Sequence, residues 1–95
     1  MFEIKTGDTP GQVALVGRLD AAESDRALMV LRGLEGPLVL DCAGLDYVSS
    51  AGIAVLMDTY KRLSTGGHSL KLVNLTPRVR NVFTYAGLDK LLGIQ

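Results

Sequence analysis

Short runs of apolar residues alternate along this chain with segments whose apolar residues are three or four positions apart. The apolar runs are Val13–Val16, Leu38–Leu40 and Leu70–Val73, and such short runs are typical of buried strands. A helical pattern follows each of them. Parallel strands joined by right-handed helical crossovers satisfy this order, so the pattern predicts an α/β fold.

The longest helical pattern follows a loop that contains two serines. Its apolar side chains are Ile53, Leu56, Met57, Tyr60 and Leu63. Polar residues lie between them, which predicts an amphipathic helix from about Ser50 to Leu63. The helix is expected to end near Gly66 and Gly67, because glycine readily adopts the positive φ of a helix exit.

Two further helices have clear start signals. Asp20 is followed three residues later by Glu23, which resembles a capping box and predicts a helix over Ala21–Arg32. Thr76 followed by Pro77 predicts an N-cap and a first helical residue for the last helix.

The strand predictions are less complete. Phe2–Lys5 and Val13–Gly17 flank a cluster of turn-forming residues, which predicts an antiparallel hairpin at the sheet edge. The second run is apolar throughout, which indicates a strand covered on both faces. The run Leu38–Leu40 is expected to end at Asp41. The last segment, Leu88–Gln95, contains Leu91, Leu92 and Ile94 and fits either a strand or a helical turn.

Composition excludes several classes of protein. With 95 residues, 47% of them hydrophobic, the chain is expected to form one domain over residues 1–95. Ten basic and ten acidic residues balance, so no nucleic-acid partner is expected. The longest apolar run, Ile53–Met57, is too short to enter a membrane as a span, and Met1–Lys5 does not resemble a signal peptide. A cytoplasmic location is therefore expected.

The residues for catalysis or metal binding are sparse. The single histidine, His68, lies in a polar turn, and the single cysteine, Cys42, adjoins an apolar run. The glycine of a nucleophile elbow is absent before the serine pair, and the glycines do not form a phosphate-binding motif. We therefore expect that the protein is not an enzyme, that it binds no cofactor and that it has no metal site.

The serine pair, Ser49 and Ser50, lies at the start of the predicted helix. A serine at this place is favoured as an N-cap, which is one interpretation of the pair. Either serine also lies where free N–H groups and the helix dipole stabilise a phosphate. The carboxyl ends of the strands are expected to bring Asp20 and Asp41 near this hydroxyl.

Three motifs in this chain resemble the STAS domain of bacterial anti-sigma factor antagonists. Tyr47–Ile53 is similar to the family signature D-S-[ST]-G-[LI], and Gly17–Asp20 is similar to its G-x-L-D. Thr76–Leu88 resembles a third segment. The resemblance implies a STAS fold, with one mixed, mostly parallel sheet of about four to five strands and about three to four helices.

The resemblance also implies a function. In that family the serine after the aspartate is phosphorylated by an anti-sigma factor that is itself a serine protein kinase, and a cognate phosphatase reverses this. The resemblance implies that this serine is Ser50 here. The resemblance implies that the unphosphorylated domain binds the partner and that phosphorylation releases it. The implied binding residues are Asp20, Tyr47, Val48, Ser49, Ser50, Ala51, Gly52 and Ile53.

The chain departs from the family pattern in three places. Ser49 occupies the position of the aspartate, which removes a negative charge, and Ala51 replaces a serine or threonine. The chain also ends soon after Leu92. An alternative function keeps the fold without the switch: a STAS subunit that docks onto a membrane transporter ATPase or a larger signalling assembly, with Ser50 as an N-cap.

Overall fold

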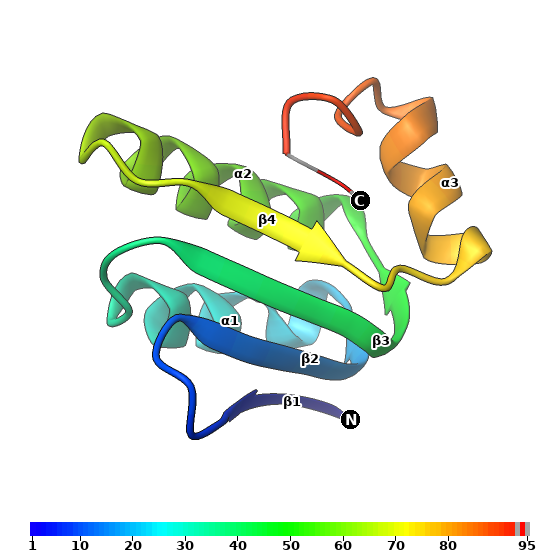
Figure 1. Cartoon of the computed structure of the whole chain (residues 1–95). Helices are drawn as coiled ribbons and strands as arrows, with labels where there is room; N and C mark the ends of the chain where they lie inside the picture. Colours follow the sequence, from blue (N-terminus) through cyan, green and yellow to red (C-terminus); the bar gives the residue numbers. More distant parts are fainter. Residues whose placement is uncertain (93, 95) are drawn as a thin grey trace.

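The computed structural model of this protein describes residues 1–92 and 94, and Figure 1 shows the course of the chain. Its elements in chain order are β1 (Phe2–Thr6), β2 (Gln12–Leu19), α1 (Ala21–Arg32), β3 (Leu38–Val48), α2 (Ser50–Thr65), β4 (Leu70–Val73) and α3 (Pro77–Tyr85). The predicted alternation of strands and helices is confirmed.

The four strands form a sheet in the order in which they occur in the chain, β1-β2-β3-β4. β1 and β2 pair antiparallel, with Ile4 opposite Leu15, whereas β2 with β3 and β3 with β4 pair parallel. The predicted edge hairpin and the mixed, mostly parallel sheet are therefore confirmed.

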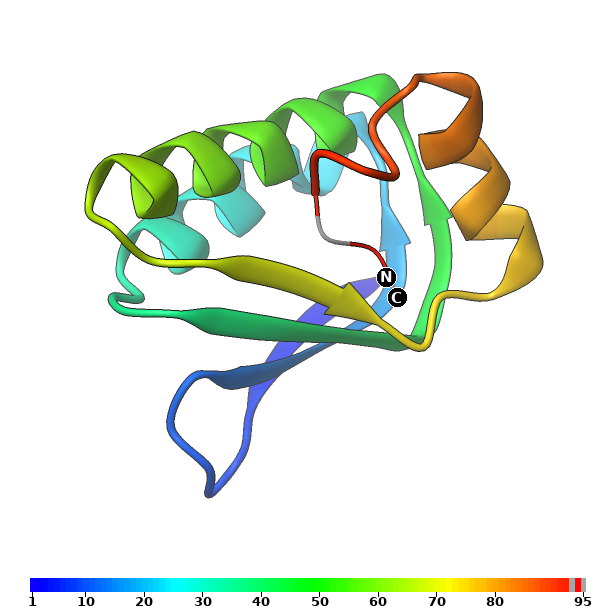
Figure 2. The ribbon, with the colours of Figure 1, turned by 45° about the horizontal axis from the view of Figure 1, so that its top comes forward.

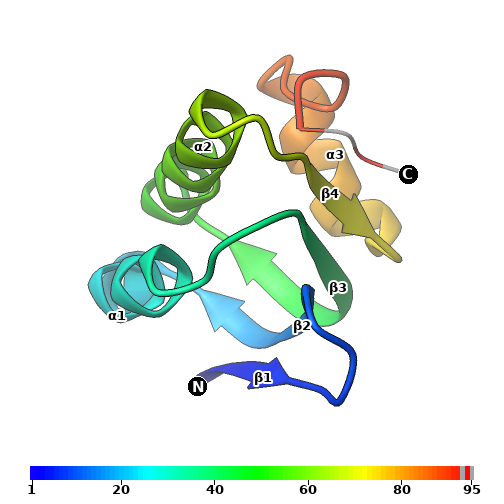
Figure 3. The same ribbon diagram turned by 60° about the vertical axis from the view of Figure 1, so that its left-hand side comes forward.

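Helices α1 and α2 lie side by side on the same face of the sheet (Figure 3). The strand order explains this arrangement, because successive right-handed crossovers in one direction place their helices on one side. On β2, Val13, Leu15 and Leu19 are buried, whereas Ala14 and Val16 on the opposite face are only partly buried. The expectation that this strand is covered on both faces is therefore wrong.

Strand β3 is longer than the sequence predicts. Instead of ending at Asp41 it continues to Val48, and it bends along this length as it passes α3 (Figure 2). Register shifts in its pairing with β2 accompany the bend. Asp41 thus lies within the strand, where its Oδ1 accepts hydrogen bonds from Ala43 N–H at 3.0 Å and from the Asn74 amide at 3.2 Å.

The helix starts agree with the predictions. Asp20 caps α1, and its carboxylate accepts a hydrogen bond from the Glu23 N–H at 3.1 Å. Thr76 caps α3, which begins at Pro77, while α2 ends slightly later than predicted. Within the described part of the chain, no helix has the length and apolar character needed to cross a bilayer.

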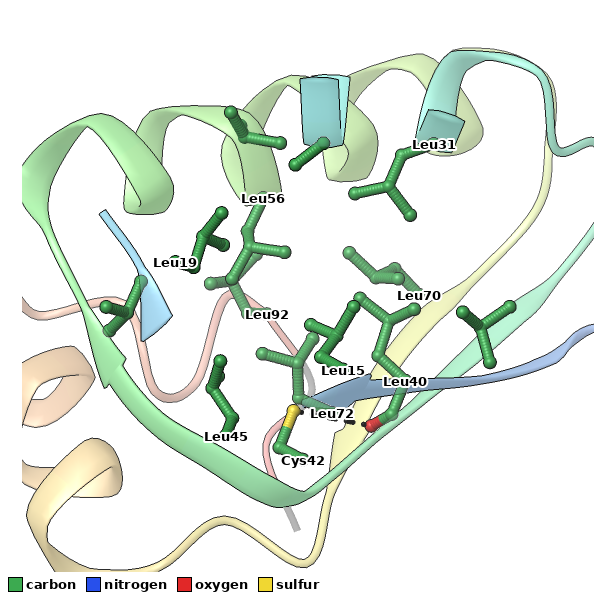
Figure 4. Packing of buried hydrophobic residues seen from close by; sticks show 14 of the residues in the cluster. Leu15, Leu19, Leu31, Leu40, Cys42, Leu45, Leu56, Leu70, Leu72 and Leu92 are labelled. Atoms are coloured by element: carbon green, nitrogen blue, oxygen red, sulfur yellow. Dashed lines mark hydrogen bonds between the residues drawn. The ribbon is translucent and has the colours of Figure 1, made fainter. Parts of the chain in front are cut away.

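Leucine side chains from the sheet and from both covering helices meet in the core (Figure 4). Leu15, Leu40 and Leu72 come from three adjacent strands, and Leu31 and Leu56 come from α1 and α2; all five are fully buried. Burial of one such side chain contributes about 1.5–3 kcal/mol to stability. This packing fixes both helices, and therefore both helix N-termini, relative to the strand ends.

The segment after α3 combines the two possibilities that the sequence leaves open. The Leu92 N–H donates to the Leu88 carbonyl at 3.0 Å, as in a helical turn, and the Leu92 side chain is fully buried. Ile94 then forms a parallel bridge with Leu72 of β4. The expectations for Gly93 and Gln95 lie outside the described residues.

Candidate functional site

The N-termini of α1 and α2 lie next to each other at one edge of the sheet. At this edge Leu19 is in register with Val48, and the Ser49 N–H donates to the Leu19 carbonyl at 2.9 Å. Asp20 and Ser49 are the N-caps of the two helices. Because helix N-termini present free N–H groups and the positive ends of their dipoles, two helices favour negative charge here.

The two serines of the loop have different environments. Ser49 is the N-cap of α2, and its Oγ accepts a hydrogen bond from the Gly52 N–H at 3.1 Å. Ser50 is the first residue of the helix and is exposed, and its hydroxyl has no hydrogen-bond partner within the described chain. The transporter alternative assigned the cap to Ser50, and that assignment is wrong. The free hydroxyl of Ser50 is accessible to another protein.

Gly52 allows α2 to approach the strands closely. It is buried, and a Cβ at this position would lie 2.7 Å from the Leu19 carbonyl oxygen and 2.9 Å from Val48 Cγ2. Both distances are too short for a non-bonded contact of a Cβ atom, so a side chain would displace the helix. The glycine therefore holds the start of α2, including Ser50, against the ends of β2 and β3.

Arg18 and Tyr47 stack on the strands that lead into this edge. They are paired in the β2–β3 register, and Arg18 Cζ lies 4.4 Å from the centre of the Tyr47 ring. Arg18 is exposed and Tyr47 is 38% exposed, so the pair forms a cation–π contact that a partner can reach. Arg18 was not among the predicted site residues, because only the strand register shows that it faces Tyr47.

The carboxylates expected around the serine hydroxyl are dispersed. Asp20 follows β2 directly and is half-buried beside Ser49. Asp41 lies inside β3 rather than at its end, so its predicted position near the hydroxyl is wrong. Asp46 lines a hollow of about 340 Å³ together with Thr76, Pro77 and Arg78. Since arginines accompany the carboxylates, the edge has mixed charge.

The other predicted binding residues differ in burial. Val48 is 3% exposed and Gly52 is also buried, so both support the loop from beneath. The members that present exposed or partly exposed surface are Asp20, Tyr47, Ser49, Ser50, Ala51 and Ile53.

The histidine and the cysteine lie away from this edge. His68 is exposed in the turn after α2, at the opposite end of the helix from Ser50. Cys42 is fully buried, and burial together with the charge of Asp41 raises the pKa of its thiol to about 12. Across residues 1–92 and 94, no three His, Cys, Asp or Glu side chains come together as a metal site would require.

Comparison with known proteins identifies the family. The family model described as "Mlab, STAS domain" matches residues 2–93. This chain belongs to the STAS domain family. The anti-sigma-B factor antagonist of Bacillus subtilis is 30% identical over 97% of this chain and 87% of its own length. BtrV of Bordetella bronchiseptica, a provisionally assigned anti-sigma factor antagonist, is 42% identical over 68% of this chain, which spans only 55% of BtrV.

Solved structures share the fold of this STAS domain. A provisionally assigned anti-sigma factor antagonist from Thermotoga maritima matches with a TM-score of 0.81 and 19% identity, covering 98% of this chain and 84% of that one. The structure of unphosphorylated SpoIIAA matches with a TM-score of 0.69 and 18% identity, covering 99% of this chain and 100% of that one. The structure of phosphorylated SpoIIAA from Bacillus matches with a TM-score of 0.71 and 18% identity, covering 100% of this chain and 89% of that one. The predicted STAS fold is confirmed.

Proposed function

We propose that this STAS domain is an anti-sigma factor antagonist whose partner binding is controlled by phosphorylation of Ser50. In its unphosphorylated form it binds a cytoplasmic anti-sigma factor that is also a serine protein kinase. Phosphorylation releases it, and a cognate phosphatase restores the binding form. The observation that carries the proposal is the exposed hydroxyl of Ser50, which the capping role of Ser49 leaves free. The antagonist relatives and the two forms of SpoIIAA support it.

The start of α2 is a favourable place for a phosphate. A phosphoserine adds about −1.5 to −2 charges and acceptor oxygens at neutral pH. At the first residue of α2 these oxygens meet free N–H groups and the helix dipole, and the N-terminus of α1 lies beside it. The modified domain therefore keeps its fold.

The same phosphate opposes docking. A partner that covers this edge has to exclude water from Ser50. A phosphate placed there would take up space in the packed interface and would lose its hydration next to the negative charge of Asp20. A conflict of about 3 kcal/mol lowers affinity by roughly a hundredfold. Ser50→Asp imitates part of this effect, because a carboxylate is smaller and carries less charge.

The serine that replaces the family aspartate is compatible with this mechanism. Serine and aspartate are both favoured N-caps, so Ser49 retains the hydrogen bond to the Gly52 N–H while removing a charge. The helix start that presents Ser50 is thus maintained. The proposed kinase has to recognise the loop without that carboxylate, through neighbours such as Asp20 and the Arg18–Tyr47 pair.

Partner affinity and thermal stability, measured on the same variants, test the switch. The probe is the anti-sigma factor kinase from the native host, with wild type, Ser50→Ala, Ser50→Asp and the matched control Ser49→Asp. We expect Ser50→Asp to lose at least tenfold in affinity without loss of stability, and Ser50→Ala to bind as wild type does. Equal affinity for wild type and Ser50→Asp would reject the switch.

Phosphate transfer tests the site itself. With the kinase and Mg-ATP, intact-mass measurement should show one phosphate on wild type and on Ser49→Ala, and none on Ser50→Ala. The opposite result for the two variants would move the modified residue to Ser49. The domain alone is proposed to have no catalytic turnover, and a hydrolase or transferase activity that persists through purification would contradict this.

A further inference from the structure

A basic hollow lies at the end of α2 opposite to Ser50. It has a volume of about 430 Å³, and it is lined by the last residue of α1 and by residues of the second half of α2: Arg32, Asp58, Lys61, Arg62 and Thr65. At 1.5 Å per residue, about 16 Å of helix axis separates Ser50 from Lys61. Three cationic side chains in the hollow face one carboxylate, so positive charge is in excess there.

The hydrogen bonds of the hollow leave part of this charge uncompensated. Arg32 binds Asp58 with two hydrogen bonds, from Nη2 at 3.0 Å and from Nε at 3.3 Å, which occupies the carboxylate. Arg62 donates from Nη2 to the Leu31 carbonyl at 2.7 Å, and its Nε is buried without an acceptor in the described chain. Lys61 is exposed and forms no ion pair with any described residue.

The electrostatic potential of the hollow favours anions. The hydrogen bond from Arg32, together with the charges of Arg32, Arg62 and Lys61, lowers the pKa of Asp58. The C-termini of α1 and α2 also end here, and each offsets about half a positive charge. About one positive charge therefore remains in excess, and the charges of Lys61 and Arg62 attract an incoming carboxylate.

We propose that this hollow is a docking site for an acidic segment of a protein partner, with carboxylates in succession along its chain. The cationic side chains lie along two helices, Arg32 on α1 and Lys61 and Arg62 on α2, which suits an extended segment better than a single small anion. Guanidinium groups pair well with carboxylates. None of the five lining side chains is aromatic, so a nucleotide base has no stacking surface there.

This site is independent of the proposed switch. The Debye length at physiological ionic strength is about 8 Å, half of the helix length that separates Lys61 from Ser50. A phosphate on Ser50 should therefore leave the affinity of the hollow unchanged. An acidic partner docked there can stay bound while the other edge of the domain releases its own partner.

A titration with an octaglutamate peptide tests the site. The peptide is added at physiological ionic strength to the ¹⁵N-labelled protein, and the amide shifts are followed by NMR. The largest shifts are expected at Arg32, Lys61, Arg62 and Thr65. Lys61→Glu should weaken binding by about tenfold. Lys71→Glu, which reverses one exposed charge on β4, should leave the affinity unchanged.

The controls separate this site from general charge attraction. Shifts spread over all basic residues, or equal weakening by Lys61→Glu and Lys71→Glu, would overturn the proposal. Inorganic phosphate or ATP that binds the same residues as tightly as the peptide would also overturn it, since the site would then accept any anion. Ser50→Asp is expected to bind the peptide as wild type does, and thermal unfolding checks that every variant is folded.

Discussion

The Oγ of Ser49 accepts a hydrogen bond from the N–H of Gly52 at 3.1 Å, while the hydroxyl of the adjacent Ser50 has no hydrogen-bond partner among residues 1–92 and 94. Ser49→Ala should therefore lower the free energy of unfolding by about 1 kcal/mol, the usual contribution of an N-cap. Ser50→Ala should change it by less than about 0.5 kcal/mol, as is typical of exposed sites. Urea unfolding of both variants measures the difference, and equal losses would contradict the assignment of the cap.

In Gly52→Ala, helix propensity and packing affect the stability in opposite directions. Propensity alone makes alanine more stable than glycine by about 1 kcal/mol within a helix. A Cβ at Gly52 would lie 2.7 Å from the Leu19 carbonyl oxygen, so α2 has to move, and such overpacking costs about 1–3 kcal/mol. We expect net destabilisation in urea unfolding.

The matched control for this substitution is Gly7→Ala. A Cβ at Gly7 meets no atom within 4 Å, so the stability should be unchanged or slightly higher. If Gly52→Ala behaved in the same way, the close approach of α2 to β2 would not be a requirement of the fold.

The buried thiol of Cys42 should make the free energy of unfolding depend on pH in alkaline solution. Burial raises the pKa of its thiol from 9.0 to about 12 in the folded protein, so between these values the unfolded chain loses a proton that the native state retains. The stability that this thiol contributes is complete below about pH 9 and is lost as the pH rises towards 12. Urea unfolding at several alkaline pH values should show a shallower decline for Cys42→Ala than for wild type.

The rate at which the Cys42 thiol reacts with a reagent also shows how readily the native structure opens. Because Cys42 is fully buried and protonated at neutral pH, a thiol reagent such as DTNB should react with the native protein only as fast as the structure opens. Rapid modification under native conditions would show that the sheet around Cys42 opens readily.

We expect Asp58 to make the free energy of unfolding depend slightly on pH in acid solution. Its pKa is lowered in the folded protein, mainly by the hydrogen bond from Arg32, relative to the ordinary value of 3.8. Its contribution to stability is thus present above about pH 4 and is lost as the pH falls through the lower folded value. Asp58→Asn should remove this part of the pH dependence between neutral and acid pH. The effect should be small, because solvent screens an exposed pair.

Local signals in the sequence determined the helices and the order of the strands. Asp20 before Glu23 and Thr76 before Pro77 each act within one helical turn, so capping chemistry alone located the starts of α1 and α3. The alternation of apolar runs with helical spacing likewise indicated the α/β sheet, because each pattern reflects one element. The family motif pointed to Ser50 by its position in the chain.

Contacts between distant residues decided the rest. The extension of β3 to Val48, the stacking of Arg18 on Tyr47 and the close packing of Gly52 on Leu19 all depend on the pairing of β2 with β3. The Leu19 carbonyl accepts a hydrogen bond from the Ser49 N–H, and Ser49 caps α2. The sequence alone did not decide which of the two neighbouring serines is the cap. The basic hollow exists only because the crossovers place the ends of α1 and α2 on one face. A linear sequence specifies local backbone preferences, but strand register and helix packing arise from the collective burial of the core.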